Sequence, residues 1–388
     1  MKAIKLRENL YWVGVIDWEL RNFHGYLTQR GSTYNAYLVI DEKITLIDNV
    51  KAAYRDEMFS RISDIIDPSK IEIHISNHVE MDHSGSLPWL MEKNPAMKIY
   101  TSPQGMKGLK EHYKKDWDFQ IVKTGDTVSL GKRSLQFINT PMVHWPDNMV
   151  CYMPEDKILF SNDSFGQHYA TSNLLDVDNP LEIILDEAKK YYANIVLPYN
   201  AQVVKEYEAV KGFPIEMIAT SHGVVWTKYI PQIIENYANW MSNKTRKKAV
   251  IIYDTMWGST KAMAYGIFVK LFQELGYEYE VFNLQNDHIS DIMTRIIDAE
   301  YIVVGSPTLN SQMLPTVAAF LTYLKGLSPK GRKAIAFGSY GWGGQSLEYV
   351  SNDLKDCGFE LIDTVKFKYI PTEDDLNAMK EEVKAKIK

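Results

Sequence analysis

The chain has 388 residues, of which 45% are hydrophobic and 24% are charged, and its formal net charge is -6. This length and composition indicate a globular protein of two or three domains with full hydrophobic cores. The negative charge and the lack of a long Lys/Arg block argue against a nucleic-acid partner.

The two cysteines, Cys151 and Cys357, lie far apart and form no Cys-x-x-Cys pair. This excludes a disulfide framework and gives no sequence support for an iron–sulfur or rubredoxin-type site. Charged residues interrupt the N-terminal segment, so it does not look like a secretion signal. No stretch approaches the ~20 apolar residues of a membrane helix. We therefore expect a cytoplasmic protein with no membrane contact.

Short predicted strands follow one another early in the chain, at 10–15, 33–40 and 44–48. Helix-like segments come next, at 52–66 and 87–92. This order predicts stacked sheets with helices outside them, rather than a regular alternation of strand and helix.

The most informative segment, 78–83, reads His-Val-Glu-Met-Asp-His and follows a strand-like apolar run. Strand alternation predicts that His78, Glu80 and Asp82 point to one side, and that His83 comes round as the chain turns into a helix. All four side chains are metal ligands by type, so one segment can supply two adjacent metal ions.

Three later predicted strands end near His144, Asp163 and His222. Because strand ends converge over one edge of a sheet, these groups can join the first segment in a binuclear site in which Asp163 is shared. Three carboxylates among four imidazoles favour non-haem iron over zinc, and loading with manganese or zinc remains open.

A polar, basic segment at 242–248 marks the predicted domain boundary, with one domain at 1–246 and the other at 247–388. After it, strands and helices alternate regularly. The predicted strands are 249–253, 279–283, 301–305, 334–337 and 360–366. Such alternation predicts an α/β, doubly wound parallel sheet, which binds ligands beyond the carboxyl ends of its strands.

Three loops at these strand ends carry hydroxyls, glycines and aromatic rings. The first contains Thr255, Met256, Trp257, Gly258, Ser259 and Thr260. The second contains Pro307, Thr308, Leu309 and Asn310, and the third contains Ser339, Tyr340, Gly341, Trp342, Gly343 and Gly344. Hydroxyls and amides at a helix N-terminus can hold a phosphate. The first loop has neither the Gly-Lys-Ser/Thr of a nucleotide-hydrolysing loop nor the Gly-x-Gly-x-x-Gly dinucleotide pattern.

Together these motifs resemble those of the flavodiiron proteins, a branch of the metallo-β-lactamase superfamily. The resemblance implies an α+β metallo-β-lactamase-like αββα sandwich followed by an α/β flavodoxin-like sheet. It also implies two iron ions. In this assignment one iron takes His78, Glu80 and His144, the other takes Asp82, His83 and His222, and Asp163 bridges them. Hydrolytic zinc relatives carry His in place of Glu80.

The resemblance further identifies the three loops as an FMN site, with the first on the phosphate and the others flanking the flavin ring. Tyr340 or Trp342 is expected to shield that ring. His24 and His168 are candidates to orient ligands or deliver protons, and Tyr192, or its neighbour Tyr191, to donate a hydrogen bond near the substrate. For these side chains a purely packed or hydrogen-bonded role is an equal alternative.

The family reduces dioxygen to water, nitric oxide to nitrous oxide, or both. With no cluster or third domain of its own, the chain is expected to take electrons from a separate donor, either rubredoxin or a reduced deazaflavin. A head-to-tail homodimer, or a dimer of dimers, is expected to bring the FMN of one subunit beside the irons of its partner. Two alternatives stay open: a zinc hydrolase with an attached flavodoxin, and a non-enzymatic electron carrier with a structural metal site.

Overall fold

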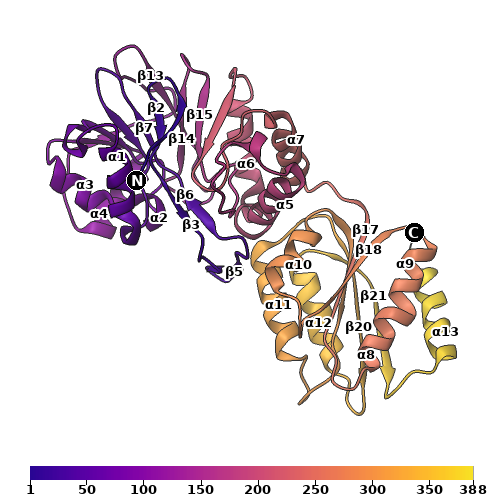
Figure 1. Ribbon diagram of the computed structural model, residues 1–388. Helices are drawn as coiled ribbons and strands as arrows, with labels where there is room; N and C mark the ends of the chain where they lie inside the picture. The colour runs from indigo at the N-terminus through magenta and orange to yellow at the C-terminus, as the bar shows by residue number, and fades with distance from the viewer. Residues whose placement is uncertain (388) are drawn as a thin grey trace. The chain divides into compact units, whose positions relative to one another are not determined.

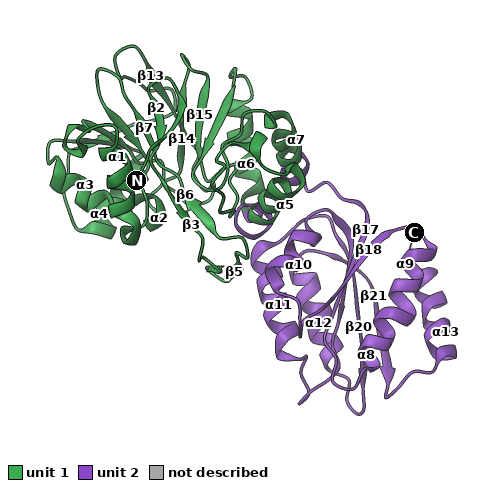
Figure 2. Ribbon diagram, in the orientation of Figure 1, with its two compact units in different colours: residues 1–191, 199–238 green, residues 192–198, 239–388 purple. Residues whose placement is uncertain are grey.

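The computed structural model describes residues 1–387, which form two compact units (Figure 2). The first comprises Met1–Tyr191 and Tyr199–Ala238, and the second comprises Tyr192–Pro198 and the described chain from Asn239 onward. The units therefore part a few residues before the basic segment. The short Tyr192–Pro198 insertion into the second unit has no signal in the sequence.

Two sheets form the middle of the first unit. The larger has the strand order β1-β2-β7-β8-β9-β10-β11. Its strands are β1 Ile4–Arg7, β2 Leu10–Trp12, β7 Tyr37–Val39, β8 Thr45–Ile47, β9 Ile73–Ile75, β10 Lys98–Thr101 and β11 Phe119–Ile121. The other runs β12-β13-β14-β15-β16. Its strands are β12 Thr127–Ser129, β13 Ser134–Asn139, β14 Met149–Met153, β15 Ile158–Asn162 and β16 Met217–Thr220.

Helices cover the outer faces of these sheets, with α1 to α4 on one flank and α5 to α7 on the other (Figure 1). Their bounds are α1 Arg55–Ser63, α2 Met81–Ser84, α3 Leu87–Lys93, α4 Pro103–Tyr113, α5 Leu181–Tyr191, α6 Asn200–Val210 and α7 Ile230–Met241. One buried apolar cluster joins the two sheets and includes Trp12, Ile75, Phe137 and Phe160. A second lies between the larger sheet and α1, α3 and α4. The predicted αββα sandwich is confirmed.

Two predicted strands of the first unit are each divided in the structure. The run at 10–15 becomes β2 and the start of β3 (Val15–Asp17), and the run at 33–40 becomes β6 (Ser32–Tyr34) and β7. Gly14 lies at the division, where a Cβ would come within 2.3 Å of the Tyr34 carbonyl oxygen. The backbones approach too closely there for any side chain, which is why glycine is needed. A small hairpin of β4 (Asn22–Phe23) and β5 (Tyr26–Leu27) follows β3.

The second unit is a five-stranded parallel sheet with the order β18-β17-β19-β20-β21. Its strands are β17 Arg246–Tyr253, β18 Glu278–Asn283, β19 Ala299–Gly305, β20 Lys333–Tyr340 and β21 Glu360–Lys368. Its helices are α8 Ser259–Met263, α9 Lys270–Glu274, α10 Ile289–Ile296, α11 Pro315–Leu327, α12 Ser346–Asp356 and α13 Glu373–Lys384. All five predicted strands are present, and the doubly wound, flavodoxin-like order is confirmed.

The inserted segment packs on the helices of the second unit. Asn194 donates a hydrogen bond to the Ser290 carbonyl oxygen (3.0 Å) and accepts one from the Tyr323 hydroxyl (2.8 Å). A buried amide with both ends paired fixes this segment firmly in its unit.

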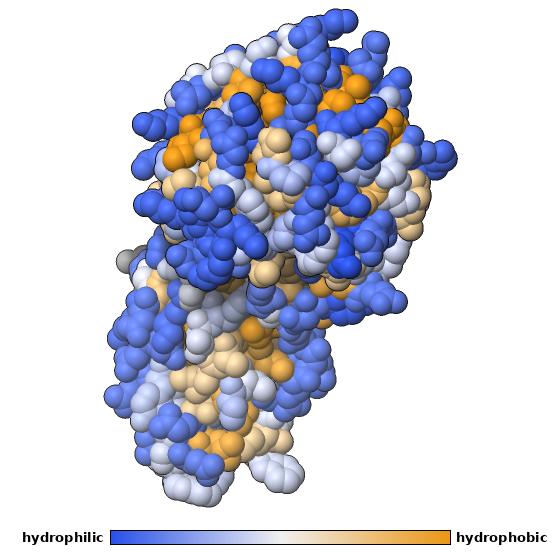
Figure 3. All heavy atoms as spheres, turned by 90° about the vertical axis from the view of Figure 1, so that its left-hand side faces the viewer, coloured by the Kyte–Doolittle hydropathy of each residue, from blue (hydrophilic) through white to orange (hydrophobic). Residues whose placement is uncertain are grey.

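In the face drawn in Figure 3, hydrophilic side chains predominate and apolar ones are scattered among them. Within residues 1–387, helices of the length and hydropathy needed to cross a bilayer do not occur. Cys151 and Cys357 are both buried as free thiols.

Candidate metal centre

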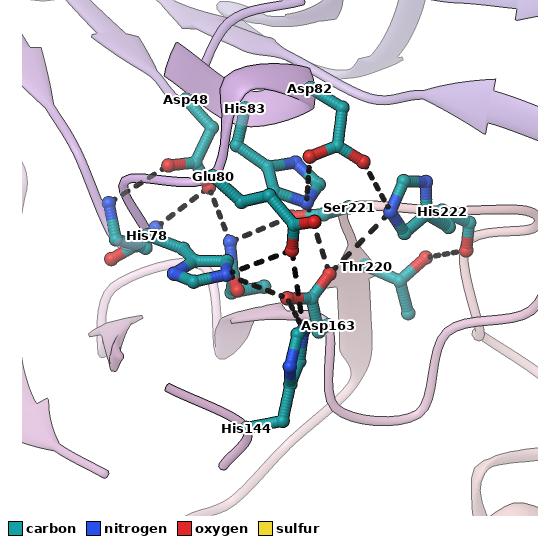
Figure 4. A network of polar contacts seen from close by, with 12 residues as sticks. Asp48, His78, Glu80, Asp82, His83, His144, Asp163, Thr220, Ser221 and His222 are labelled. Carbon is teal, nitrogen blue, oxygen red and sulfur yellow. Dashed lines mark hydrogen bonds and ion pairs between the residues drawn. The ribbon is translucent and has the colours of Figure 1, made fainter. Parts of the chain in front are cut away.

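The seven predicted metal ligands come together at one edge of the sandwich (Figure 4). They come from four segments of the chain. The first runs from the end of β9 through α2, the second is the loop after β13, and the third and fourth are the turns after β15 and β16. The prediction that strand alternation directs the side chains of His78, Glu80 and Asp82 to one side is wrong, because β9 ends at Ile75. His78 and Glu80 lie in a loop, whereas Asp82 and His83 belong to α2.

One group of facing atoms consists of His78, His144, Glu80 and one oxygen of Asp163. The Nε2 atoms of His78 and His144 lie 3.4 and 3.5 Å from Glu80 Oε2. The same two nitrogens lie 3.8 and 3.4 Å from Asp163 Oδ2. These separations suit atoms that share one metal ion at about 2.0–2.2 Å each.

The other oxygen of Asp163 faces a second group. His83 Nε2 is 3.1 Å and His222 Nε2 is 3.6 Å from Asp163 Oδ1. Asp82 completes this group, with Oδ1 3.5 Å from His83 Nε2 and Oδ2 3.3 Å from His222 Nε2. Asp163 thus offers one oxygen to each group, which is the geometry of a bridging carboxylate.

Two histidines have their tautomer fixed by a neighbour. The Nδ1–H of His78 donates to Asp147 Oδ2 (2.8 Å), and that of His222 donates to the Thr33 carbonyl oxygen (2.7 Å). A proton held at Nδ1 leaves the Nε2 lone pair free and directed into the site. Such outer partners orient a ligating imidazole and raise its basicity.

The carboxylates fit a cationic occupant. Both oxygens of Asp82 and of Asp163 are buried and, among the described residues, receive no hydrogen bond. Leaving such charges unpaired is costly, so the arrangement needs positive charge between its members. Burial works against protonation of His83, but the charges of Asp82 and Asp163 outweigh it and raise its pKa to about 9. The site therefore attracts positive charge strongly.

His24 and His168 both lie at the site, in different ways. His24 is largely exposed, and its Nε2 lies 3.0 Å from the second oxygen of Glu80. His168 is fully buried, with Nδ1 2.8 Å from the Ser32 hydroxyl and its ring 4.8 Å from that of His222. Burial, and then the neighbouring His222, lower the pKa of His168 well below its usual value. Its ring is therefore neutral.

Of the two adjacent tyrosines, the structure brings Tyr191 to the histidines. Its ring lies 5.1 Å from His168 and 5.9 Å from His222. Tyr192, the residue chosen from the sequence, packs its ring on Trp240 at 5.3 Å within the second unit. Tyr191 is the last residue of α5, and Tyr192 begins a π-helical segment, so their side chains have different neighbours. We assign the position beside the site to Tyr191.

Two carboxylates beside the ligands were missed in the sequence. Asp147 accepts from His78 and also from the Val79 backbone N–H (2.7 Å). Asp48 accepts from the Asn77 N–H (2.8 Å) and from the Asn162 side chain (3.4 Å), so it connects the chain before His78 to the residue before Asp163. Asp147 lies three residues after His144, which was the only available signal.

In the second unit the three predicted loops meet at the carboxyl ends of the strands. The Thr260 and Ser339 hydroxyls are 3.4 Å apart, and the Thr308 N–H donates to the Ser339 carbonyl oxygen at 3.2 Å. Ser259 and Thr260 already belong to α8, and Ser339 and Tyr340 still belong to β20, so these loops are shorter than expected.

The first loop has the form of a phosphate-binding turn. The Thr255 hydroxyl accepts from the Gly258 N–H (3.0 Å), and Gly258 has φ +89 with open space where a Cβ would point. Asp254, which the sequence analysis left unassigned, is buried and accepts from Gln285 and Thr316. The hydrogen bonds to Asp254 thus fix the turn on its buried side, while the space beside Gly258 stays open to a ligand.

Two tryptophans flank this open face. Trp257 is 92% exposed and Trp342 is 85% exposed. Aromatic rings left so open are available to pack against a bound ligand. Gly343 and Gly344, which follow Trp342, both have positive φ and let the backbone approach a ligand closely.

Comparison with known proteins agrees with this architecture. A family model described as ODP family beta lactamase matches residues 33–223, and one described as Flavodoxin matches residues 251–382. The nitric oxide reductase of Moorella thermoacetica is 43% identical over 366 residues, which cover 93% of this chain and 92% of that protein. The rubredoxin-oxygen oxidoreductase of Megalodesulfovibrio gigas is 42% identical over 387 residues, covering 98% and 96%.

Among solved structures, the flavodiiron protein from Giardia intestinalis superposes with a TM-score of 0.96 at 34% identity, covering 100% of this chain and 97% of that one. The sandwich with its two facing ligand groups, the flavodoxin-like sheet and these full-length relatives lead to one conclusion. The chain belongs to the flavodiiron protein family.

Proposed function

We propose that the chain is an FMN- and diiron-dependent reductase that converts dioxygen to water, nitric oxide to nitrous oxide, or both. Electrons pass from an external donor through FMN to the diiron site. The observation that carries this proposal is the pair of facing ligand groups, which share Asp163 and no other residue. The similarity to the nitric oxide reductase of Moorella and the rubredoxin-oxygen oxidoreductase of Megalodesulfovibrio supports the same two substrates.

In this proposal His78, Glu80 and His144 hold one iron, Asp82, His83 and His222 hold the other, and Asp163 bridges them. Bound irons supply a place where a small oxidant is held and takes up electrons. Glu80 favours iron over zinc, because it adds a carboxylate where hydrolytic relatives carry an imidazole, and zinc prefers nitrogen-rich sites.

The remaining side chains orient the ligands and handle protons. His24 holds the second oxygen of Glu80, which fixes the rotation of that carboxylate. Neutral His168 and the Tyr191 hydroxyl supply hydrogen-bonding groups beside the second ligand group. Burial, and then the charge of Asp163, hold the Tyr191 pKa well above its usual value, so its hydroxyl remains a donor. Its neighbour Tyr192, the other candidate for this hydrogen bond, packs on Trp240.

The three loops of the second unit hold FMN, with its phosphate at the turn before α8. Trp257 and Trp342 then lie beside the flavin, which reduces their exposure. The residues that contact FMN are those of the three loops predicted from the sequence. The donor is rubredoxin or a reduced deazaflavin, and the protein acts in the cytoplasm.

A head-to-tail homodimer, or a dimer of two such dimers, completes the proposed electron path. Sedimentation analysis of the active holoprotein should give a dimer or tetramer. Full activity in a species that is entirely monomeric would contradict this part of the proposal.

The principal test compares wild type with Asp163→Asn under anaerobic conditions. Wild type should contain two irons and, once its FMN is reduced, should consume dioxygen or nitric oxide repeatedly. The variant should lose iron and activity while it keeps FMN, because the substitution removes the only charge shared by both groups. Normal turnover by the variant would overturn the bridge assignment.

The same preparation separates the two alternatives. Two zinc ions with no iron would support the hydrolase. Iron and FMN without catalytic uptake of either gas would support the electron carrier.

A further inference from the structure

A small apolar cavity lies in the first unit between the outer face of its second sheet and helices α6 and α7. Its volume is about 120 Å³. The lining side chains come from β15, β16, both helices and the segments between them. They include Leu159, Phe165, Val210, Ile218 and Ile234. The residues described above as metal or FMN candidates do not line it.

The chemistry of the lining excludes polar ligands. Among the residues that line the cavity, Tyr207 and Lys211 are the two that carry polar side chains. Lys211 is exposed and Tyr207 is half-buried, whereas Val210 and Ile218 are buried. A water molecule needs two to four polar partners, and the other eight lining residues have apolar side chains. An engineered apolar cavity of about 150 Å³ stays dry and binds xenon, so this one has the size and character to hold a small, uncharged molecule.

Phe165 lines the cavity and belongs to the turn that begins at Asp163. It lies two residues after Asp163, is 4% exposed and has φ +65, which bulky residues rarely adopt. Its N–H donates to the Tyr237 hydroxyl (2.6 Å), and its carbonyl oxygen accepts from the Trp226 indole N–H (2.8 Å). Both backbone polar groups are thus fixed, which holds the ring in the cavity wall at the end of the Asp163 turn.

The residues that follow Asp163 are held by buried neighbours. Ser164 donates to both oxygens of buried Glu206 at 2.7 and 2.9 Å, and the Phe165 ring packs in a tilted arrangement on Tyr237 at a centroid distance of 4.3 Å. The turn that carries the shared carboxylate therefore has an apolar compartment at one side.

We propose that this cavity binds the gaseous substrate, dioxygen or nitric oxide, before it passes Phe165 to the metal centre. The inference rests on the proposed function, because that function supplies a small, neutral, sparingly soluble substrate. Such a gas partitions from water into an apolar space without any hydrogen bond.

Xenon provides a test that does not depend on activity. Crystals of the iron- and FMN-loaded wild type, pressurised with xenon, should show an anomalous peak among Leu159, Val210 and Ile218. The absence of xenon from this cavity would overturn the proposal, even in a fully active enzyme. Xenon bound in an enzyme that reduces neither gas would contradict the proposed function and leave the cavity assignment standing.

A matched pair of variants on α6 tests the route. Val210 lines the cavity, whereas Val204 is 39% exposed on the same helix and does not. Val210→Phe should exclude xenon and raise the KM for dioxygen roughly fivefold with little change in kcat, because only substrate capture is lost. Val204→Phe should change neither.

Overpacking costs about 1–3 kcal/mol, so iron content, FMN content and the melting temperature are measured for each variant. If Val210→Phe does not fold, Ile234→Phe on α7 replaces it. A cavity-filling variant with intact cofactors and an unchanged KM would overturn the role in substrate capture.

Discussion

Replacing Asp147 by Asn removes a charge from behind one metal ligand while keeping the shape of the side chain. The Asp147 carboxylate is buried and accepts from the His78 imidazole at 2.8 Å and from the Val79 N–H at 2.7 Å through the same oxygen. An amide oxygen can still accept both bonds, so the loop keeps its fold. What is lost is the charge that makes these bonds strong and makes His78 a better ligand.

The size of the effect follows from these contacts. Charge-assisted hydrogen bonds are about twice as strong as neutral ones, and losing an outer partner of a metal-bound imidazole typically costs about 10–100-fold in metal affinity. That range equals about 1.4–2.7 kcal/mol. We therefore expect Asp147→Asn to weaken binding of the iron held by His78 by this factor and to leave the other iron unchanged.

Competition with a chelator, followed by Mössbauer spectroscopy on ⁵⁷Fe-loaded protein, measures this directly. One of the two iron signals should shift and be lost first. Asp116→Asn is the control, because Asp116 is an exposed acid that pairs with Lys110. Equal loss of both irons, or wild-type affinity at both, would refute the reasoning.

Two further predictions concern parts of the chain outside the ligand set. Burial lowers the pKa of His74 from 6.5 to about 4, partly offset by the Leu46 carbonyl oxygen, so the unfolded chain takes up a proton at a higher pH than the folded one. Folding stability should therefore fall between pH 6.5 and about 4, by roughly 3 kcal/mol from this residue. Denaturant titrations of wild type and His74→Gln should differ in pH slope over this window, and equal slopes would contradict the assignment. In the second unit, Thr255→Val removes the acceptor of the Gly258 N–H and should weaken FMN binding roughly tenfold, or about 1.4 kcal/mol. Flavin fluorescence titration measures this, and unchanged affinity would show that the turn does not depend on that bond.

Elements with strong local signals could be predicted well from the sequence. The three central strands of the second unit, β17, β19 and β20, contain apolar runs that are buried on both faces, and a parallel sheet between helices is the fold that such runs favour. The edge strands β18 and β21 are more polar and more exposed. The ligand-rich segment 78–83 was recognisable because its members are adjacent in sequence. The directions of their side chains could not be predicted, because β9 ends at Ile75 and a short helix carries Asp82 and His83.

Hydrogen-bond partners of the metal-site residues that come from distant segments could not be predicted. Asp147 and His78 are 69 residues apart, and Ser32 and His168 are 136 apart, so neither pairing has a local pattern. The different contacts of Tyr191 and Tyr192 could not be predicted for a related reason. Adjacent residues at a helix end face different neighbours, and only the tertiary structure shows which neighbour is the metal centre.

The central claim is that two metal ions lie in two ligand groups that share Asp163, and anomalous diffraction at the iron edge tests it most directly. Crystals of the holoprotein should show two iron peaks, one among His78, Glu80 and His144 and the other among Asp82, His83 and His222, with Asp163 between them. A single peak, a zinc signal in place of iron, or iron bound elsewhere would contradict the account.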